Sequence, residues 1–360
     1  MTQGRRARVL IVDDSALVRQ ILTQILSSDP DIEVVGTAND PFIARERIKE
    51  LNPDLITLDI EMPRMDGLEF LEKIMTLRPM PVLMISSLTQ KGADATLRAL
   101  EIGAVDFVGK PTIDLQVGLR DLAQEIVTKA KAAAGARVRS LRNQNHAPTT
   151  LSTTTIRYSS TDKIIAIGAS TGGVEALSVV LKAMPANAPG ILVTQHMPAQ
   201  FTESFAKRLN NVCSINVSEA RDGTTVLPGH AYIAPGGQHL RLARSGGKFV
   251  CQVGGTDRVS GHCPSVDELF DSVGRVAGHN SVGVILTGMG KDGAKGLLAM
   301  RRAGAHSIGQ DEATCVVYGM PRAAFEIGAV ETQVPLEQIA NQTLRQFNTQ
   351  PDAVHRASGS

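Results

Sequence analysis

Short apolar runs alternate with helix-like stretches along this chain, and this alternation constrains the fold more than any other feature. In the first third, short strands of this kind are expected at residues 9–12, 33–36, 55–58, 82–85 and 104–108. Between them, apolar residues recur every three to four positions, as on one face of a helix. Such strands separated by helices are typical of a parallel sheet covered on both faces. We therefore predict a five-stranded parallel α/β domain.

A change of composition separates this domain from a second one. Residues 132–161 are rich in Ala, Arg, Ser, Thr and Asn and poor in large apolar residues, which is typical of a helix end followed by a flexible linker. A second series follows, with strands at 164–167, 191–194 and 282–286 and a glycine-rich, β-forming stretch at 212–253. We predict a first domain at 1–131, a doubly wound, mostly parallel α/β domain with a β-hairpin at 162–350, and a disordered tail at 351–360.

The composition argues against several classes of function. The net charge is +1 over 360 residues and there is no Trp, so we expect neither a nucleic-acid surface nor a base-stacking platform. The first apolar run is too short for a signal peptide or a membrane span. The four cysteines have no CxxC spacing, which favours free thiols in a reducing compartment. We therefore expect a cytoplasmic protein without membrane insertion.

Polar residues follow four of the predicted strands in the first domain. Asp13 and Asp14 follow the first strand, Asp59 the third, Ser86 the fourth and Lys110 the fifth. The carboxyl ends of parallel strands share one edge of a sheet, so these side chains should meet there. Three carboxylates repel one another unless a cation lies among them, and Mg²⁺ prefers such oxygen ligands. The alternative, that the aspartates only cap helices and turns, would leave their common position unexplained.

Residues 7–128 resemble a response-regulator receiver domain, which has a flavodoxin-like fold. The resemblance rests on the stretches VLIVDDSALVR, LITLDIEMPRMDGLEFL, PVLMISS and GAVDFVGKP. It implies that Asp59 accepts a phosphoryl group from a CheA-type histidine kinase. It also implies that Asp13, Asp14 and Asp59 surround Mg²⁺, together with the backbone carbonyl of Glu61.

The same resemblance implies roles for other residues of the first domain. Lys110 would contact the phosphoryl group, and Ser86 would hydrogen-bond to it in the active state. Phe107 stands where the family has its rotating aromatic switch. The Lys110–Pro111 bond would be cis.

The first strand of the second domain leads into Gly168-Ala169-Ser170-Thr171-Gly172, which fits the G-x-S-x-G pattern of a strand-to-helix turn. Ser170 is therefore a candidate nucleophile, and free N–H groups at the start of the next helix, near Val174, could bind an oxyanion. Two alternatives remain from this motif alone. The glycine-rich turn could hold a phosphate or a dinucleotide, or Ser170 could be a plain helix cap.

A base and an orienting carboxylate are expected from the ends of other strands. His196 follows the strand at 191–194, so it should lie beside Ser170. Asp292 follows the long apolar strand at 282–286, although it could instead cap the next helix. Asp311 is the rival carboxylate after a shorter strand. The order Ser, His, Asp differs from that of α/β-hydrolases, and triads are recognised by geometry rather than order.

Residues 162–335 resemble the chemotaxis protein-glutamate methylesterase family. The carrying stretches are IIAIGASTGGVEAL, ILVTQHMP, LPGHAYIAPGGQHL, PSVDELF, GVILTGMGKDGAKGLLAMR and GQDEATCVVYGMPRAA. The resemblance implies a triad of Ser170, His196 and Asp292, with Thr171 and Met289 lining the site and no metal in this domain.

The implied substrates are γ-glutamyl methyl esters, and also glutamines, on methyl-accepting chemotaxis receptors. Phosphorylation of the first domain would activate a monomeric enzyme. Two other functions compete with this reading. A nucleotide-binding module without catalysis is disfavoured because the chain has neither a Walker lysine nor G-x-G-x-x-G. A transcription regulator is disfavoured because no helix-turn-helix or basic region follows the linker.

Overall fold

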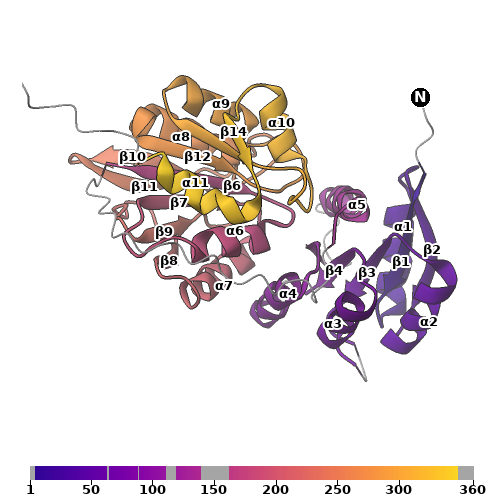
Figure 1. The fold of residues 1–360 in the computed structure, drawn as a ribbon. Coiled ribbons are helices and arrows are strands. Elements are labelled where there is room, and N and C mark those ends of the chain that lie inside the picture. Colours follow the sequence, from indigo (N-terminus) through magenta and orange to yellow (C-terminus); the bar gives the residue numbers. More distant parts are fainter. Residues whose placement is uncertain (1–4, 63–64, 88, 111–118, 139–161, 348–360) are drawn as a thin grey trace, which may run out of the picture.

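The computed structural model describes residues 5–62, 65–87, 89–110, 119–138 and 162–347. Two α/β domains lie side by side (Figure 1). The N-terminal domain has a fully parallel five-stranded sheet in the order β2-β1-β3-β4-β5, which confirms the predicted class. Its strands are β1 (Ala7–Val12), β2 (Ile32–Ala38), β3 (Leu55–Asp59), β4 (Val82–Ser86) and β5 (Asp106–Gly109). Its helices are α1 (Ala16–Ser27), α2 (Pro41–Leu51), α3 (Gly67–Leu77), α4 (Gln90–Ile102) and α5 (Leu119–Ala134).

Local sequence explains where these helices begin. Asp40, Asp66 and Thr89 precede α2, α3 and α4, and each side chain accepts a hydrogen bond from a first-turn N–H group. Helix α4 ends at Gly103, whose φ of +119° suits glycine. Helix α5 continues past residue 131, the predicted end of the first domain, so the start of the predicted linker is helical.

The C-terminal domain has a seven-stranded sheet in the order β14-β13-β12-β6-β7-β9-β8, and all its pairings are parallel. The predicted hairpin is a separate antiparallel pair, β10 with β11. The strands are β6 (Ile164–Ala169), β7 (Gly190–Gln195), β8 (Asn216–Glu219), β9 (His230–Ile233), β10 (His239–Ser245), β11 (Lys248–Gly254), β12 (Ser281–Ile285), β13 (His306–Gln310) and β14 (Thr332–Val334). The α-helices are α6 (Gly173–Lys182), α7 (Ala199–Asn210), α8 (Val266–Ala277), α9 (Ala294–Arg302), α10 (Met320–Glu326) and α11 (Ile339–Arg345).

The order of this sheet reverses direction at β6. The chain proceeds from β6 to β7 on one side and later from β12 to β13 on the other. In open α/β sheets, ligands usually bind beside such a reversal point, at the carboxyl ends of the strands. In the first domain, β1 lies between β2 and β3 and creates the same situation.

The two domains pack through α4 and the end of β5, which face α6 and α7 (Figure 1). The ring of Phe107 packs against the ring of Phe201, with 4.4 Å between centroids. Arg208 of α7 forms an ion pair with Glu101 of α4. Buried apolar residues of both domains consequently form one continuous cluster.

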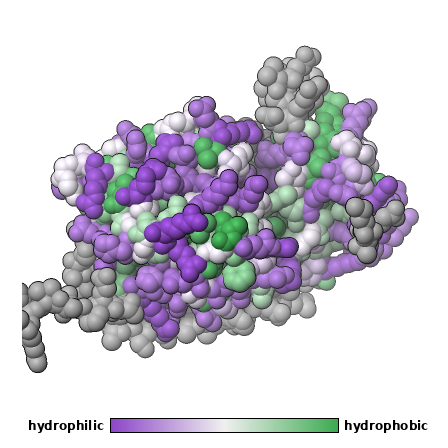
Figure 2. Space-filling model, turned by 90° about the horizontal axis from the view of Figure 1, so that it is seen from above, coloured by the Kyte–Doolittle hydropathy of each residue, from purple (hydrophilic) through white to green (hydrophobic). Residues whose placement is uncertain are grey.

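The face in Figure 2 is mostly hydrophilic, with hydrophobic residues in small areas. None of the described helices combines the length and apolar character that a membrane span needs. Residues 139–161, most of the predicted linker, and the predicted tail lie outside the described residues. So does Pro111, and with it the expected cis bond.

Candidate active site and acidic pocket

Ser170 lies in the tight turn between β6 and α6. Its backbone N–H donates to the carbonyl of Thr287 beyond β12 (3.0 Å), and its carbonyl accepts from Gly173 N (2.7 Å). Gly172 turns the chain with a φ of +77°, and a Cβ there would lie 2.7 Å from a side-chain carbon of Val316. The turn thus needs glycine for both conformation and space.

His196 follows β7 directly and lies between the two expected partners. Its Nδ1 is 3.1 Å from Ser170 Oγ, and its Nε2 is 2.8 Å from Asp292 Oδ2. An ionised carboxylate only accepts, so the Nε2 proton is donated to Asp292 and the Nδ1 lone pair faces the serine hydroxyl. The three predicted side chains therefore meet in the order that general-base activation of a serine requires.

Asp292 does not cap α9, because Gly293 holds the N-cap position of that helix. Instead its carboxylate lies at the N-terminus of α8. Oδ2 accepts from Val266 N (2.7 Å), and Oδ1 accepts from Ser265 Oγ (2.8 Å) and Asp267 N (3.0 Å). Burial opposes ionisation, but the hydrogen bonds to His196 and these donors outweigh it and lower the pKa of Asp292.

The S-x-x-E pattern at Ser265–Glu268 is typical of a capping box, but the box at the start of α8 is only half formed. Ser265 Oγ accepts from Glu268 N (3.5 Å). The Glu268 carboxylate, however, accepts from Arg241 Nε, and the N–H of Ser265 donates to His239 Nδ1 at 3.1 Å. The Ser265 hydroxyl can therefore donate to Asp292, so this residue serves the site as well as the helix.

The N-terminus of α6 faces the nucleophile as predicted, with one difference. The N–H of Gly173, the first residue of the helix, already donates to the carbonyl of Ser170. Oxyanion donors must therefore come from the other N–H groups at this end of the helix, where the helix dipole also favours negative charge.

Thr171 and Met289 were expected to line the site. Thr171 is buried, and its hydroxyl points to the other domain, where it donates to Asp106 Oδ2 at 2.5 Å. Met289 is half-buried in the loop that also carries Asp292. The rival carboxylate, Asp311, accepts from Thr314 and does not contact His196.

Two contacts of the site were not predicted from the sequence. Gln195 Nε2 donates to the carbonyls of Ser170 (2.9 Å) and His196 (3.2 Å), and so ties the two loops together. His262 stacks on the ring of His196. The position of Gln195 at the end of β7 was an available signal, whereas His262 comes from a loop that has no strand pattern.

A narrow cleft between the domains reaches Ser170. Gly172 and Gln195 line it on the C-terminal side, and Asp106 and Phe107 line it on the other. Beyond the hydrogen bond from Thr171, Asp106 has an ion pair with Lys129 Nζ at 3.4 Å. The N-terminal domain therefore covers one side of the nucleophile loop.

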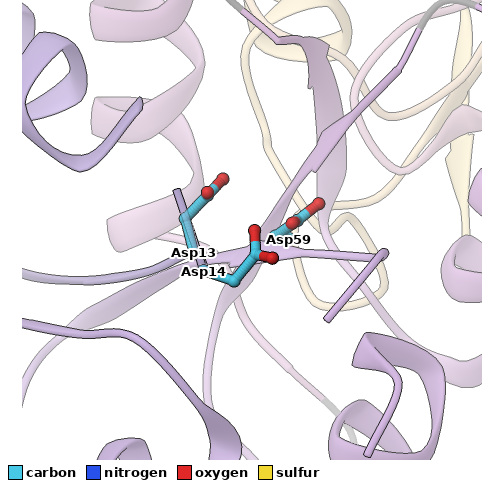
Figure 3. A group of neighbouring side chains, drawn as sticks. All are labelled: Asp13, Asp14 and Asp59. Atoms are coloured by element: carbon cyan, nitrogen blue, oxygen red, sulfur yellow. The ribbon is translucent and has the colours of Figure 1, made fainter. Parts of the chain in front are cut away.

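The acidic pocket of the N-terminal domain forms as predicted. Ligand oxygens of Asp13, Asp14 and Asp59 lie within 4.8 Å of one another (Figure 3). Lys110 Nζ is 2.7 Å from Asp59 Oδ2 and 3.6 Å from Asp13 Oδ2. Asp13 Oδ2 is buried without a hydrogen-bond partner among the described residues. A cluster of hard oxygens with an unsatisfied buried atom fits Mg²⁺.

Burial and charge set the protonation of this pocket. Burial, together with the nearby Asp13 carboxylate, raises the pKa of Asp59 to about 6, although Lys110 opposes the shift. Burial also raises the pKa of Asp13. For Lys110 burial acts in the opposite direction, but the ion pairs with Asp59 and Asp13 outweigh it and raise the lysine pKa.

The two expected switch residues are both buried and engaged elsewhere. Ser86 Oγ accepts from Thr96 Oγ1 at 2.6 Å and donates to the carbonyl of Ser87 at 3.2 Å. The Phe107 ring lies in the domain contact, with Lys129 Nζ 5.1 Å from its centroid.

The fold and these two sites define a class of protein: a receiver domain joined to a domain with serine-hydrolase geometry. Two family descriptions match, "Response regulator receiver domain" over residues 9–120 and "CheB methylesterase" over residues 165–343. The chain is 56% identical over 351 residues to protein-glutamate methylesterase/protein-glutamine glutaminase 1 of Xanthomonas campestris pv. campestris, covering 96% of this chain and 98% of the relative.

A relative with the same name in Geobacter metallireducens is 55% identical over 356 residues, which cover 97% of this chain and 98% of the relative. The solved Thermotoga maritima CheB methylesterase catalytic domain is 39% identical, with a TM-score of 0.50, and the match covers 51% of this chain and 97% of that one. The chain therefore belongs to the CheB family of protein-glutamate methylesterases/protein-glutamine glutaminases.

Proposed function

We propose that this chain is a phosphorylation-activated protein-glutamate methylesterase and protein-glutamine glutaminase that acts on methyl-accepting chemotaxis receptors. The observation that carries the proposal is the hydrogen-bonded series from Ser170 to His196 to Asp292, with distances of 3.1 and 2.8 Å. The names of the relatives described above support the substrate class.

In the first half-reaction, Ser170 Oγ attacks the side-chain carbonyl carbon of the receptor residue while His196 Nδ1 takes its proton. Asp292 keeps the imidazole in the required tautomer and stabilises the imidazolium. The negative oxygen of the tetrahedral intermediate lies at the N-terminus of α6, where one oxyanion donor typically contributes about 2.7–4 kcal/mol.

Collapse of the intermediate breaks the bond to the leaving group, which takes the proton back from His196. Methanol leaves from an ester, and ammonia leaves from a glutamine. Water then attacks the acyl-enzyme with His196 again as base, which releases a glutamate carboxylate and restores Ser170. One set of side chains thus serves both activities.

The receiver domain supplies the control of this reaction. We propose that a CheA-type histidine kinase donates a phosphoryl group to Asp59. Lys110 would neutralise charge on the transferred oxygens. Mg²⁺ held by Asp13, Asp14 and Asp59 would supply further charge neutralisation when bound.

Access to Ser170 would depend on the contact between the domains. Asp106 and Phe107 of β5 hold the nucleophile loop and α7, respectively. A phosphoryl group on Asp59 would change the interactions available to Ser86 and Phe107. It favours an open arrangement only to the extent that it stabilises that arrangement more than the closed one.

The decisive experiment measures release of labelled methanol from methyl-labelled receptor, with and without a small phosphodonor and Mg²⁺. Wild type should respond to the phosphodonor, and Ser170→Ala should release nothing above background. Ser218→Ala, at an exposed position of β8, is the matched control and should behave as wild type. Hydrolysis by Ser170→Ala at the wild-type rate would overturn the proposal.

We further infer that the protein works in the cytoplasm. All four cysteines, Cys213, Cys251, Cys263 and Cys315, have free thiols, which suits a reducing compartment. Its action as a monomer stays a prediction, which light scattering of the purified chain would test.

A further inference from the structure

A second imidazole covers one face of the proposed general base. The rings of His262 and His196 are 3.7 Å apart at their centroids and 8° from parallel. His262 is half-buried. The contact is thus one of ring faces rather than of polar atoms, and it leaves both nitrogens of His196 free to bond with Ser170 and Asp292.

A strained turn presents His262 to the site. Val259 and His262 exchange two backbone hydrogen bonds of 3.0 Å. The residues between them, Ser260 and Gly261, have φ values of +53° and +85°, as a type I′ turn requires. A positive φ is uncommon for serine, and such conformations persist where the surroundings enforce them.

The turn is anchored at the same helix start as the catalytic carboxylate. Ser260 Oγ donates to Asp267 Oδ2 at 2.7 Å, and Asp267 Oδ1 accepts from Gly296 N at 2.7 Å. The backbone N–H of Asp267 donates to Asp292. Asp267 therefore hydrogen-bonds both the turn that carries His262 and the carboxylate that binds His196. This links the position of the stacked ring to that of the triad.

His262 is uncharged when the enzyme works. Burial, and next the neighbouring His196, lower its pKa to about 4. The other charged groups that act on its pKa are Asp292 from the loop after β12, Arg258 from its own loop and Lys129 from the receiver. A neutral aromatic ring can lie against an imidazolium without repulsion, and its π face attracts the cation.

We propose that His262 is a positioning residue for the general base. Its ring keeps the His196 imidazole in the plane that serves Ser170 and Asp292 together. It also stabilises the imidazolium that forms when His196 takes the serine proton. This inference rests on the proposed function, since it assigns a role within the same reaction.

Substitutions of His262 distinguish the effect of its aromatic face from the effect of its volume. His262→Ala should lower kcat by about 2- to 30-fold, the range expected for one cation–π contact, and leave KM within about twofold. His262→Phe keeps an aromatic face and should recover most of that loss. His262→Leu fills the space without a π face and should recover less than Phe.

The full chain should be tested with Mg²⁺ and a small phosphodonor. Methanol release gives kcat and KM, and the rate of Ser170 labelling by a fluorophosphonate reports its activation directly. In the labelling step, Ser170 oxygen bonds to phosphorus, fluoride leaves and His196 takes the proton. His230→Ala, which removes a histidine stacked on Tyr232 elsewhere in the domain, is the matched control and should retain wild-type rates.

The outcomes distinguish this inference from the proposed function. A wild type that neither releases methanol nor reacts at Ser170 would overturn both. An active wild type with His262→Ala equal to it would overturn the inference alone. If thermal denaturation shows that His262→Ala does not fold, the other two variants decide the question. A higher kcat for His262→Phe than for His262→Leu supports the proposal, and equal kcat values overturn it.

Discussion

In each domain of this protein a buried aspartate stands at the carboxyl end of a central parallel strand, next to the point where the strand order reverses. Asp59 ends β3, and Asp292 lies in the loop after β12. Both side chains are almost fully buried. Their pKa values nevertheless shift in opposite directions, upward to about 6 for Asp59 and downward for Asp292.

The difference lies in what faces the two carboxylates. Asp59 accepts one backbone hydrogen bond, from Glu61 N at 3.2 Å, and is paired with Lys110 while Asp13 repels it. Asp292 receives four donors, from His196, Ser265, Val266 and Asp267. Burial alone therefore does not set the charge of a carboxyl group, because the donors around it can outweigh desolvation.

This contrast matches two kinds of chemistry. A phosphoryl acceptor needs an oxygen that is incompletely satisfied, and Asp59, the proposed acceptor, has fewer hydrogen-bond donors than Asp292. A carboxylate that orients a histidine needs to stay ionised and fixed, and the start of α8 holds Asp292 in that state. The same place in the same architecture would thus supply the proposed phosphoryl acceptor in one domain and the proposed orienting carboxylate in the other.

The largest effect is expected from neutralising Asp292, the carboxylate with four hydrogen-bond donors. Asp292→Asn should lower kcat by about 10⁴-fold, because an amide can donate to His196 and favour the wrong tautomer. Methanol release from labelled receptor measures the loss, and Asp311→Asn is the matched control. Activity near wild type for Asp292→Asn would remove Asp292 from the catalytic set.

Neutralising Asp59, the carboxylate with fewer donors, should by contrast stabilise the folded protein at neutral pH. A carboxyl whose folded pKa exceeds its unfolded value favours folding below pH 3.8, and that contribution is lost as the pH rises through about 6. Without Mg²⁺, Asp59→Asn should therefore raise the free energy of unfolding at pH 7 by about 1–3 kcal/mol.

Denaturant unfolding of the full chain in EDTA at pH 4 and pH 7 tests this expectation. The gain of Asp59→Asn should shrink toward pH 4, where the wild-type carboxyl is protonated. Added Mg²⁺ should stabilise wild type more than the variant, because the variant lacks one of the three carboxylates. An equal gain at both pH values would show that charge is not its cause.

The smallest effect is expected at the hydrogen bond from Thr171 to Asp106, which joins the two domains. Asp106→Asn should weaken the hydrogen bond from Thr171 and the ion pair with Lys129, and so favour the open arrangement. Hydrogen bonds to charged groups contribute about 1.5–3 kcal/mol, and Asn weakens the bond without removing it. For a loss of about 1.4 kcal/mol, basal methanol release without phosphodonor should rise about 10-fold. Loss of the exposed pair by Glu101→Ala should change it less than twofold. Unchanged basal release in Asp106→Asn would separate this bond from gating.

Much of both sites could be predicted because their residues follow strands. Asp13, Asp59, Ser170 and His196 each stand at or just beyond the end of an apolar run, and parallel strands bring such ends together. The same rule predicts Asp292, although only the structure excludes its alternative role as a helix cap, because Gly293 holds that position.

The parts that were missed depend on contacts between segments that no local pattern relates. His262 reaches His196 through a four-residue turn, and Asp106 reaches Thr171 across the domain contact. The bond from Ser265 to Asp292 likewise depends on how α8 packs against the loop after β12.

The sequence by itself determined the two parallel sheets, the acidic pocket and the three side chains of the proposed triad, because strand and helix periodicities are local and strand ends share an edge. Only the tertiary structure decided which hydrogen-bond donors face each carboxylate, which ring covers His196 and where the receiver meets the nucleophile loop. Those features depend on distances between residues far apart in the chain, and packing alone sets such distances.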